Sequence, residues 1–281
     1  MSRADPGVIE RAEAAAPSAA YRRFLRAERR GHLFVRLAQA GLLLVFLLFW
    51  EFAPRYGLVN PMFTSYPSAL WPTFLGVLHG TANQPGILEH AASTVVATVV
   101  GFSGAMVVGV IVAAALWWWK RLYRVLDPFL VVANAMPKIA FVPIFYIWLG
   151  ATLSIYGMAL AISVFITILM LHAGFEGVDA NKVKLAQTFG ASRWQVLRMV
   201  VLPGSVPTLI AALKVNTGLA LVGVVVGEFQ SASLGLGYLI QYGSQVFKLD
   251  IVMTAITLLA VLSALMYLAI AALERRVLAR R

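Results

Sequence analysis

The stretch DANKVKLAQTFGASRWQVLRMVVLPGSVP, residues 179–207, lies between two long apolar segments and carries four basic residues. Its pattern predicts a helix, a break and a second short helix. Asp179 can cap the first helix and Ser192 the second, while Gly190 ends the first helix in a left-handed turn. Pro203 and Pro207 stop or kink the chain after the second helix. Val183, Leu185, Ala186 and Phe189 recur at helical spacing in the first helix, and we expect Trp194, Val196, Leu197 and Val200 to face inward in the second.

A short amphipathic helix in such a loop has three interpretations. It can lie on the surface of its own membrane, it can dock into a groove of another protein, or it can be an ordinary solvated loop helix. The pattern alone leaves all three open.

The stretch resembles the coupling loop of permease subunits of bacterial ATP-binding-cassette (ABC) importers. That family's pattern is Glu-Ala-Ala, three residues, Gly, nine residues, Ile, one residue and Leu-Pro. The residues in register with it are Gly190, Val200, Leu202 and Pro203. Lys184 and Leu185 replace the first Glu and Ala, whereas Ala186 keeps the second Ala, so the acidic contact of the family is missing here.

The resemblance implies that this loop contacts a separate ATPase. The residues expected at that contact are Asp179, Lys182, Lys184, Leu185, Ala186, Phe189, Gly190, Ala191, Ser192, Trp194 and Pro203.

The composition is that of a membrane protein. Of the 281 residues, 60% are hydrophobic and only 12% are charged, whereas a soluble domain has about 25% charged residues. The net charge of +11 does not indicate nucleic-acid binding, because nineteen of the 23 Lys and Arg residues fall in four clusters: before Leu37, in 117–127, in 173–203 and after Leu273. Clusters that alternate with nearly uncharged loops follow the positive-inside rule.

Apolar runs between these clusters predict an all-α polytopic protein with six transmembrane helices. The predicted spans are residues 33–53, 91–119, 128–149, 153–173, 207–229 and 251–273, with the third and fourth separated by a break at 149–152. Residues 1–31 are expected to form a cytoplasmic tail and 32–281 the transmembrane permease domain, whose coupling loop is 174–206. Six spans place both termini in the cytoplasm.

Further motifs occur in the order seen in permeases of the nitrate, sulfonate, taurine and bicarbonate type, the binding-protein-dependent transport inner membrane components. They are His90-Ala-Ala-Ser-Thr, Asp127-Pro128-Phe129, Met136-Pro137-Lys138-Ile-Ala, Gly190-Ala-Ser-Arg-Trp and Gly235-Leu-Gly237-Tyr238. The resemblance implies the type I importer (MetI-like) fold in a bacterial inner membrane. It also implies a homodimer of permeases, a cytoplasmic ATPase dimer that binds ATP and Mg²⁺, and a periplasmic or lipid-anchored binding protein.

Other chemistry finds no support in the sequence. No G-x-x-x-x-G-K-[ST] motif is present for ATP, there is no cysteine, and the four histidines lack metal-ligand spacing. We therefore expect no catalytic residue, metal or cofactor in this chain. His90 opens a span and is interpreted as an interfacial or capping group.

Polar residues inside the predicted spans, together with the Met136–Pro137 kink, are candidates for the transport pathway or its gate. They are Asn134, Met136, Pro137, Lys138, Asn216 and Glu228. Lys138 either faces the pathway or pairs with a carbonyl exposed by Pro137, and Glu228 either lines the pathway or holds the following periplasmic stretch. The two asparagines can simply bond between helices, and the Met136–Pro137 kink is either a gate or packing.

The predicted function is the permease subunit of an ATP-driven importer for a small organic or inorganic anion such as a sulfonate, nitrate or carboxylate. One alternative is a secondary carrier or channel that works without ATP, although a coupling loop would then have no purpose and no internal repeat is seen. A membrane-anchored scaffold is the other alternative, but it would not need Lys138 and a third span broken by prolines.

Overall fold

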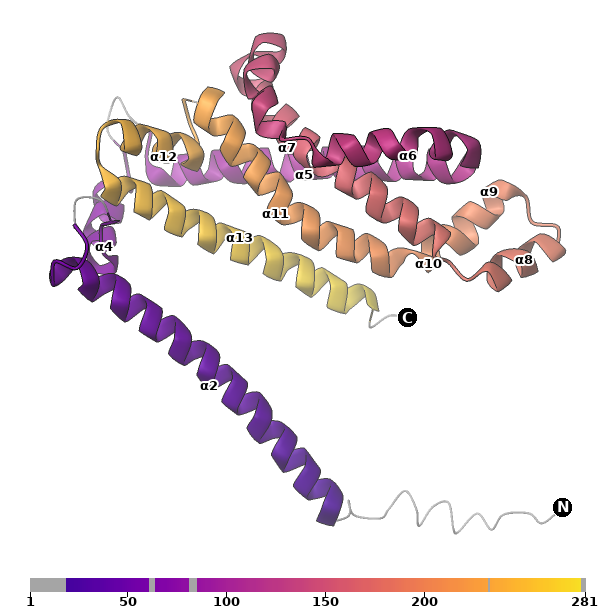
Figure 1. The fold of residues 1–281 in the computed structure, drawn as a ribbon, viewed down its shortest axis with the longest axis horizontal. Helices are drawn as coiled ribbons and strands as arrows, with labels where there is room; N and C mark the ends of the chain where they lie inside the picture. Colours follow the sequence, from indigo (N-terminus) through magenta and orange to yellow (C-terminus); the bar gives the residue numbers. More distant parts are fainter. Residues whose placement is uncertain (1–18, 61–63, 81–84, 232, 279–281) are drawn as a thin grey trace. The chain divides into compact units, whose positions relative to one another are not determined.

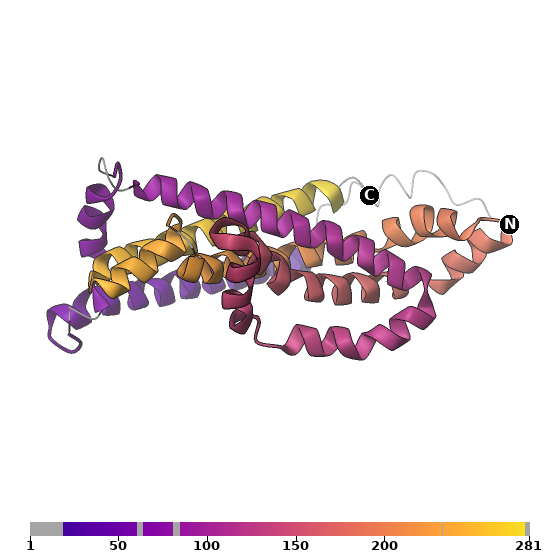
Figure 2. The same ribbon diagram turned by 90° about the horizontal axis from the view of Figure 1, so that it is seen from above.

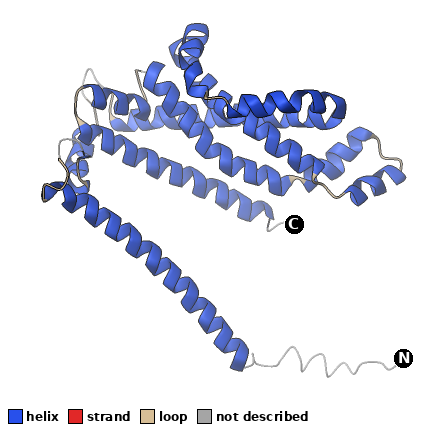
Figure 3. Cartoon of the chain, viewed as in Figure 1, coloured by secondary structure: helices blue, strands red, loops and turns tan. Residues whose placement is uncertain are grey.

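A computed structural model describes residues 19–60, 64–80, 85–231 and 233–278 of the chain. Every regular element in this part is a helix, and it contains no strand (Figure 3). The prediction of an all-α protein is therefore confirmed. The chain divides into two compact units, Met1–Pro67 and Ser68–Arg281, which are described separately.

The first unit consists mainly of helix α2, Ala19–Arg55. Its apolar part, Leu33–Arg55, is long enough to cross a membrane and agrees with the first predicted span. The helix ends where Arg55 pairs with Glu51 at 2.5 Å and lies 5.2 Å from the centre of the Tyr66 ring. Charged and aromatic groups of this kind mark the exit of a span into the interface.

The tail expected at 1–31 is only partly described. Residues 1–18 lie outside the described part of the chain, and α2 already begins at Ala19. The helix therefore runs without interruption through residue 31.

Four long helices build the second unit: α5 (Ile87–Trp118), α7 (Val142–Glu176), α11 (Val206–Ser231) and α13 (Leu249–Leu278). They run roughly along its long axis in Figures 1 and 2, apart from the first part of α7. Helix α7 packs against both α5 and α11, and these three helices hold most of the buried residues. The core of the unit is thus a helix trio with α7 in its middle.

Small residues allow this close packing. A methyl group added at Gly223 would lie 2.6 Å from the Cα of Ala159, and one at Gly227 would lie 2.8 Å from the Cα of Ile155. The glycines of α5 that face side chains of α7 are Gly101, Gly104 and Gly109. Because backbone atoms are the neighbours at Gly223 and Gly227, α11 can approach α7 only where it has no side chain.

The predicted third span, 128–149, is not one helix. Helix α6 (Lys120–Ala135) ends at the Met136–Pro137 pair, and a 3₁₀ turn, η1 (Lys138–Phe141), leads into α7. The prolines cause the break, because Pro137 has no backbone N–H to continue the helix. With 16 residues α6 is too short to cross a bilayer alone.

The break predicted at 149–152 is present inside α7. Gly150 has a φ of +75° and a ψ of 178°, so the helix is interrupted there and its first part points away from the rest (Figure 1). In the described residues, five helices rather than six are long and apolar enough to cross a membrane. They are Leu33–Arg55, Ile87–Trp118, Lys138–Glu176, Val206–Gln230 and Leu249–Val277. The third of these helices, Lys138–Glu176, takes in the end of the predicted third span together with the whole of the fourth, and α6, with 16 residues, is too short to count as a span of its own.

Short helices occupy the two ends of the second unit. At one end lie α8 (Ala180–Thr188), α9 (Arg193–Val196), the π-helical turn η2 (Leu197–Val201) and α10 (Leu202–Gly204). At the other end lie α4 (Pro67–Gly76) and α12 (Leu236–Gln245). Both views show α8 and α9 beyond the ends of the long helices (Figures 1 and 2).

Candidate functional site

The loop between α7 and α11 has the predicted layout of helix, break and helix. Asp179 caps α8 by accepting a hydrogen bond of 2.8 Å from the Asn181 N–H. At the other end Gly190 has a φ of +79° and donates to the Gln187 carbonyl at 2.9 Å, while Ala191 donates to Ala186 at 3.0 Å. This pair of bonds is a Schellman motif, which requires the left-handed conformation that glycine adopts most readily.

The second helix is capped at once after the break. The Ser192 hydroxyl accepts a bond of 3.3 Å from the Gln195 N–H, and the Gln195 side chain accepts one of 2.7 Å from the Ser192 N–H. This reciprocal capping box leaves two fewer free donors at the start of α9. Both ends of the Gly190 turn are therefore fixed by local hydrogen bonds.

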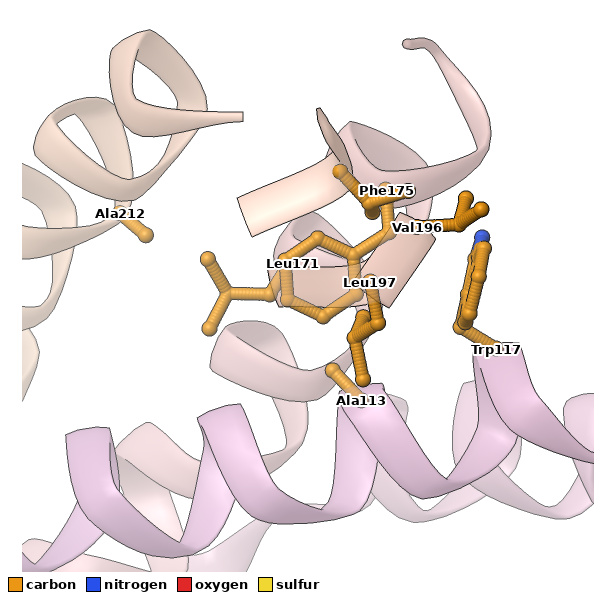
Figure 4. Packing of buried hydrophobic residues seen from close by; sticks show 8 residues of the cluster. Ala113, Trp117, Leu171, Phe175, Val196, Leu197 and Ala212 are labelled. Atoms are coloured by element: carbon orange, nitrogen blue, oxygen red, sulfur yellow. The ribbon is translucent and has the colours of Figure 1, made fainter. Parts of the chain in front are cut away.

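The base of the loop is anchored in the core of the bundle. Val196 and Leu197 belong to a buried cluster that also contains Ala113 and Trp117 of α5, residues of α7 and one residue of α11 (Figure 4). The other members of this cluster are Leu171, Phe175, Val201 and Ala212. Burial of each large apolar side chain is worth about 1.5–3 kcal/mol, so the base is held firmly to the long helices.

The tip of the loop exposes large apolar side chains. Leu185 and Trp194 are each 58% exposed and Phe189 is 82% exposed. The prediction that Trp194 faces inward is wrong, and Val200 is only half-buried. Trp194 lies in the first turn after the break, beyond the reach of the core, whereas Val196 and Leu197 reach it as predicted. We call Leu185, Phe189 and Trp194 the apolar tip.

The other residues predicted to contact the ATPase are partly exposed and partly packed against the base of the loop. Lys182 and Lys184 are exposed on α8, whereas Ala186 and Ala191 pack against the buried cluster. Pro203 is exposed and lies in the first turn of α10, where a proline ring fits the helix.

Lys138 occupies the broken third span. Its ammonium group donates to the Asn134 carbonyl at 2.7 Å and lies 3.4 Å from the Met136 carbonyl. In a continuous helix the backbone N–H of residue 138 would bond to Asn134, so the side chain replaces the bond that the break at Pro137 removes. The ammonium also lies 5.7 Å from the centre of the Phe165 ring of α7.

Glu228 lies elsewhere, in a buried polar cluster at the α12 end. The carboxylate is 1% exposed and accepts bonds from the Thr94 hydroxyl at 2.9 Å and from the Gly237 N–H at 2.8 Å. Gly237 belongs to the first turn of α12, whose unpaired N–H groups and helix dipole favour a carboxylate. In this geometry Glu228 holds the stretch after it, which was one of its two expected roles.

His90 and Thr94 complete the attachment of α12. The imidazole Nδ1 of His90 accepts a bond of 2.9 Å from the N–H of Gly235, the N-cap of α12, and Thr94 accepts one of 2.8 Å from the Leu236 N–H. His90 thus bonds the N-cap residue of α12 and does not cap the helix to which it belongs. The sequence did not indicate that its partner is Gly235, although both residues stood in motifs already noted.

Asn216 is fully buried in α11. Its amide nitrogen lies 3.7 Å from the Met106 sulfur of α5, and its side-chain oxygen has no partner among the described residues. The six predicted pathway residues therefore occupy three places: the break at 134–138, the middle of α11, and the buried cluster beneath α12.

Comparison with known proteins decides the family. Residues 105–279 match the family described as binding-protein-dependent transport system inner membrane component. The chain belongs to this family. It is an ABC importer permease of the taurine, sulfonate and nitrate type, which confirms the resemblance.

Relatives of this permease cover most of its length. It is 27% identical over 238 residues to the taurine transport system permease protein TauC of Escherichia coli, covering 84% of this chain and 86% of TauC. The riboflavin transport system permease protein RibX of Chloroflexus aurantiacus is 29% identical, with 83% and 86% covered. The nitrate import permease protein NrtB of Synechocystis is 29% identical, with 63% of each chain covered.

The fold also matches a solved transporter. An inward-facing structure of the MetNI methionine ABC transporter superimposes with a TM-score of 0.62 at 20% identity, covering 68% of this chain and 95% of that chain. The permease therefore has the MetI-like fold, as the resemblance implied.

Proposed function

We propose that two copies of this permease form the substrate pathway of an ATP-driven importer and that loop 179–200 couples the pathway to a separate ATPase. The observation that carries the proposal is the contrast between the ends of the loop. Its base is buried in α5, α7 and α11, whereas the apolar tip is exposed. Apolar side chains held out from a rigid base suit a groove of a partner protein.

The packing suggests how a movement of the loop, driven by the ATPase, would reach the long helices. Val196 and Leu197 lie against Ala113 and Trp117 of α5 as well as against α7. A displacement of the tip would therefore move α5 and α7 together, because a close-packed interior transmits shifts rather than absorbing them. The motion would thus enter α5 as well as the helices directly before and after the loop.

The proposed substrate is a small anion such as a sulfonate, a nitrate or a carboxylate. The named substrates of several relatives, taurine, aliphatic sulfonates and nitrate, support this class, although RibX is named for riboflavin. In the chain itself, Lys138 supplies a half-buried cation at the break of the third span. Its two carbonyl contacts hold the ammonium in place, and at least one of its three N–H donors is left for an anion.

The partners belong to the same proposal. A cytoplasmic ATPase dimer would supply ATP and Mg²⁺, and a periplasmic or lipid-anchored binding protein would deliver the substrate at the α12 end. Both termini would then be cytoplasmic in a bacterial inner membrane. No cofactor is proposed for the permease itself.

Site-directed cross-linking tests the coupling role. The chain has no native cysteine, so Phe189→Cys introduces a single thiol at the tip. We expect it to cross-link to cysteines placed in the groove of a co-expressed cassette ATPase, with a yield that changes when ATP is added. Ser244→Cys, exposed on α12 at the opposite end, is the matched control and should give no cross-link. Equal yields for the two variants would reject the proposal.

A further inference from the structure

A cavity of about 480 Å³ lies beneath the coupling loop. Its apolar wall includes Trp117, Phe175 and Val196, which belong to the buried cluster shown in Figure 4. The opposite wall is the inner side of α8, with Val183 and Lys184. The cavity is therefore an open recess between the ends of the long helices and the loop.

The charge on the cavity lining is predominantly positive. Lys120, Lys184 and Arg193 line it together with one acidic residue, Glu176. Lys120 lies 3.5 Å from the Glu176 carboxylate, which balances one cation. Among the described residues, neither Lys184 nor Arg193 forms an ion pair. Two cations that share one cavity and are not paired with a carboxylate favour an anionic ligand.

Arg193 lies over two tryptophan rings. The centre of its guanidinium lies 5.2 Å from the Trp118 ring centre and 5.8 Å from that of Trp117. Stacking occupies the face of a guanidinium and leaves the N–H groups at its edge available. An edge of this kind binds a phosphate through two parallel hydrogen bonds.

The depth of the cavity in the membrane indicates the source of the phosphate. Its lining includes residues at the ends of two apolar helices, Trp117 in the last turn of α5 and Glu176 at the end of α7. Tryptophan and basic residues at the end of a span mark the level of the lipid headgroups. Clusters of basic residues at this level bind anionic headgroups.

We propose that this cavity binds a phosphate group and that its source is the headgroup of an anionic phospholipid. Arg193 and Lys184 hold the phosphate oxygens, and the tryptophans pack against the glycerol region. A headgroup in this place contacts the loop and the end of α5 at once, so it braces the loop against the membrane. The inference uses the position of the spans and does not depend on an ATPase partner.

Lipid retention measures this site directly. The full-length protein is reconstituted in phosphatidylcholine nanodiscs, titrated with phosphatidylglycerol and analysed by native mass spectrometry. We expect the double variant Lys184→Met/Arg193→Met to bind phosphatidylglycerol about tenfold more weakly than the unmodified protein. The control Lys182→Met/Arg198→Met removes the same charge from the same loop but from residues that do not line the cavity, and it should bind normally.

The possible outcomes test separately whether the site exists and whether its phosphate comes from a lipid. Equal retention of phosphatidylglycerol by all three proteins would overturn the proposal. Displacement of the lipid by inorganic phosphate, or phosphate binding in pure phosphatidylcholine that only the cavity variant loses, would keep the phosphate site and assign its ligand to the cytosol. Unchanged thermal unfolding of both double variants excludes loss of folding as the cause.

Discussion

The hydroxyl of Thr94 donates a hydrogen bond of 2.9 Å to the carboxylate of Glu228, across 134 residues of sequence. This bond joins α5 to α11 within a protein interior where both side chains are almost fully excluded from solvent. The same carboxylate accepts from the first turn of α12. One acidic side chain therefore connects three helices at the end of the bundle opposite the coupling loop.

Removal of this carboxylate should loosen α12. In Glu228→Ala the Gly237 N–H loses its partner and the Thr94 hydroxyl loses one, and an unsatisfied buried group costs about 1–3 kcal/mol. We expect a lower midpoint of thermal unfolding in detergent and faster proteolysis near α12. Glu89→Ala, an exposed neighbour on α5, should change neither measurement. Equal effects of the two variants would argue against the anchoring role.

The contact between α7 and α11 depends on an absent side chain. Gly223→Ala would place a methyl group 2.6 Å from the Cα of Ala159, which is backbone and cannot move aside cheaply. Overpacking of this kind costs about 1–3 kcal/mol. Gly218→Ala lies on the same helix with nothing within 4 Å, and we expect it to be neutral or slightly stabilising. Thermal unfolding of both variants compares the two positions; a neutral Gly223→Ala would contradict the packing.

Substitution of Lys138 tests whether this residue acts in transport or only in folding. Lys138→Met removes the cation and leaves the Asn134 carbonyl without that donor. We expect uptake of taurine, a sulfonate or nitrate into proteoliposomes to fall at least about tenfold, the effect of losing roughly 1.4 kcal/mol, whereas assembly with the ATPase persists. Lys138→Arg should retain more uptake, and Lys248→Met in the outer loop serves as the control. If Lys138→Met transports normally at every substrate concentration, Lys138 is not in the pathway.

Local patterns predicted the features that local physics determines. The cap at Asp179, the turn at Gly190 and the break near Gly150 depend on residues within one or two turns of each other. The division of the third span arises at Pro137, which cannot donate a helical hydrogen bond. These features could be predicted because chain neighbours impose them.

Features that depend on contacts between distant residues could not be predicted from the sequence. His90 and Gly235 are 145 residues apart, and no periodicity indicates that one caps the other. Trp194 shares α9 with the buried Val196 and lies three residues before the buried Leu197, yet its own side chain is exposed. The three separate places of the pathway residues are likewise set by helix packing, which the positions of polar residues along the spans do not specify.

Topology is open to a direct labelling experiment. The proposed orientation places Arg193 in the cytoplasm and Ser244 in the periplasm. In intact cells, Ser244→Cys should react with a membrane-impermeant maleimide, whereas Arg193→Cys should react only after the cells are lysed. Both side chains are exposed, so a difference in reactivity reports the side of the membrane rather than burial. Labelling of Arg193→Cys in intact cells would reverse the orientation.

The turn at Gly190 should separate folding from coupling. A Cβ at this position meets nothing within 4 Å, so Gly190→Val is penalised by the φ of +79° alone. The left-handed conformation costs a branched residue at least about 1–2 kcal/mol, and the strain falls on the Schellman motif that directs α8. The buried base of the loop does not include Gly190, so the bundle should still insert and dimerise. We therefore expect weak binding of the ATPase, or ATP hydrolysis without transport, measured by co-purification and by uptake into proteoliposomes.

A conservative variant distinguishes this strain from a general effect of mutating the loop. Asparagine adopts the left-handed region more readily than valine, so Gly190→Asn should recover most of the coupling that Gly190→Val loses. Both variants add a side chain to the same open space, and they differ mainly in the backbone conformation that they tolerate. Normal ATPase association and transport in Gly190→Val would refute the coupling role of the turn. Loss of membrane insertion in the same variant would show instead that the loop is needed for folding. In that case the buried base of the loop would not be enough to keep the bundle folded when the Gly190 turn is strained.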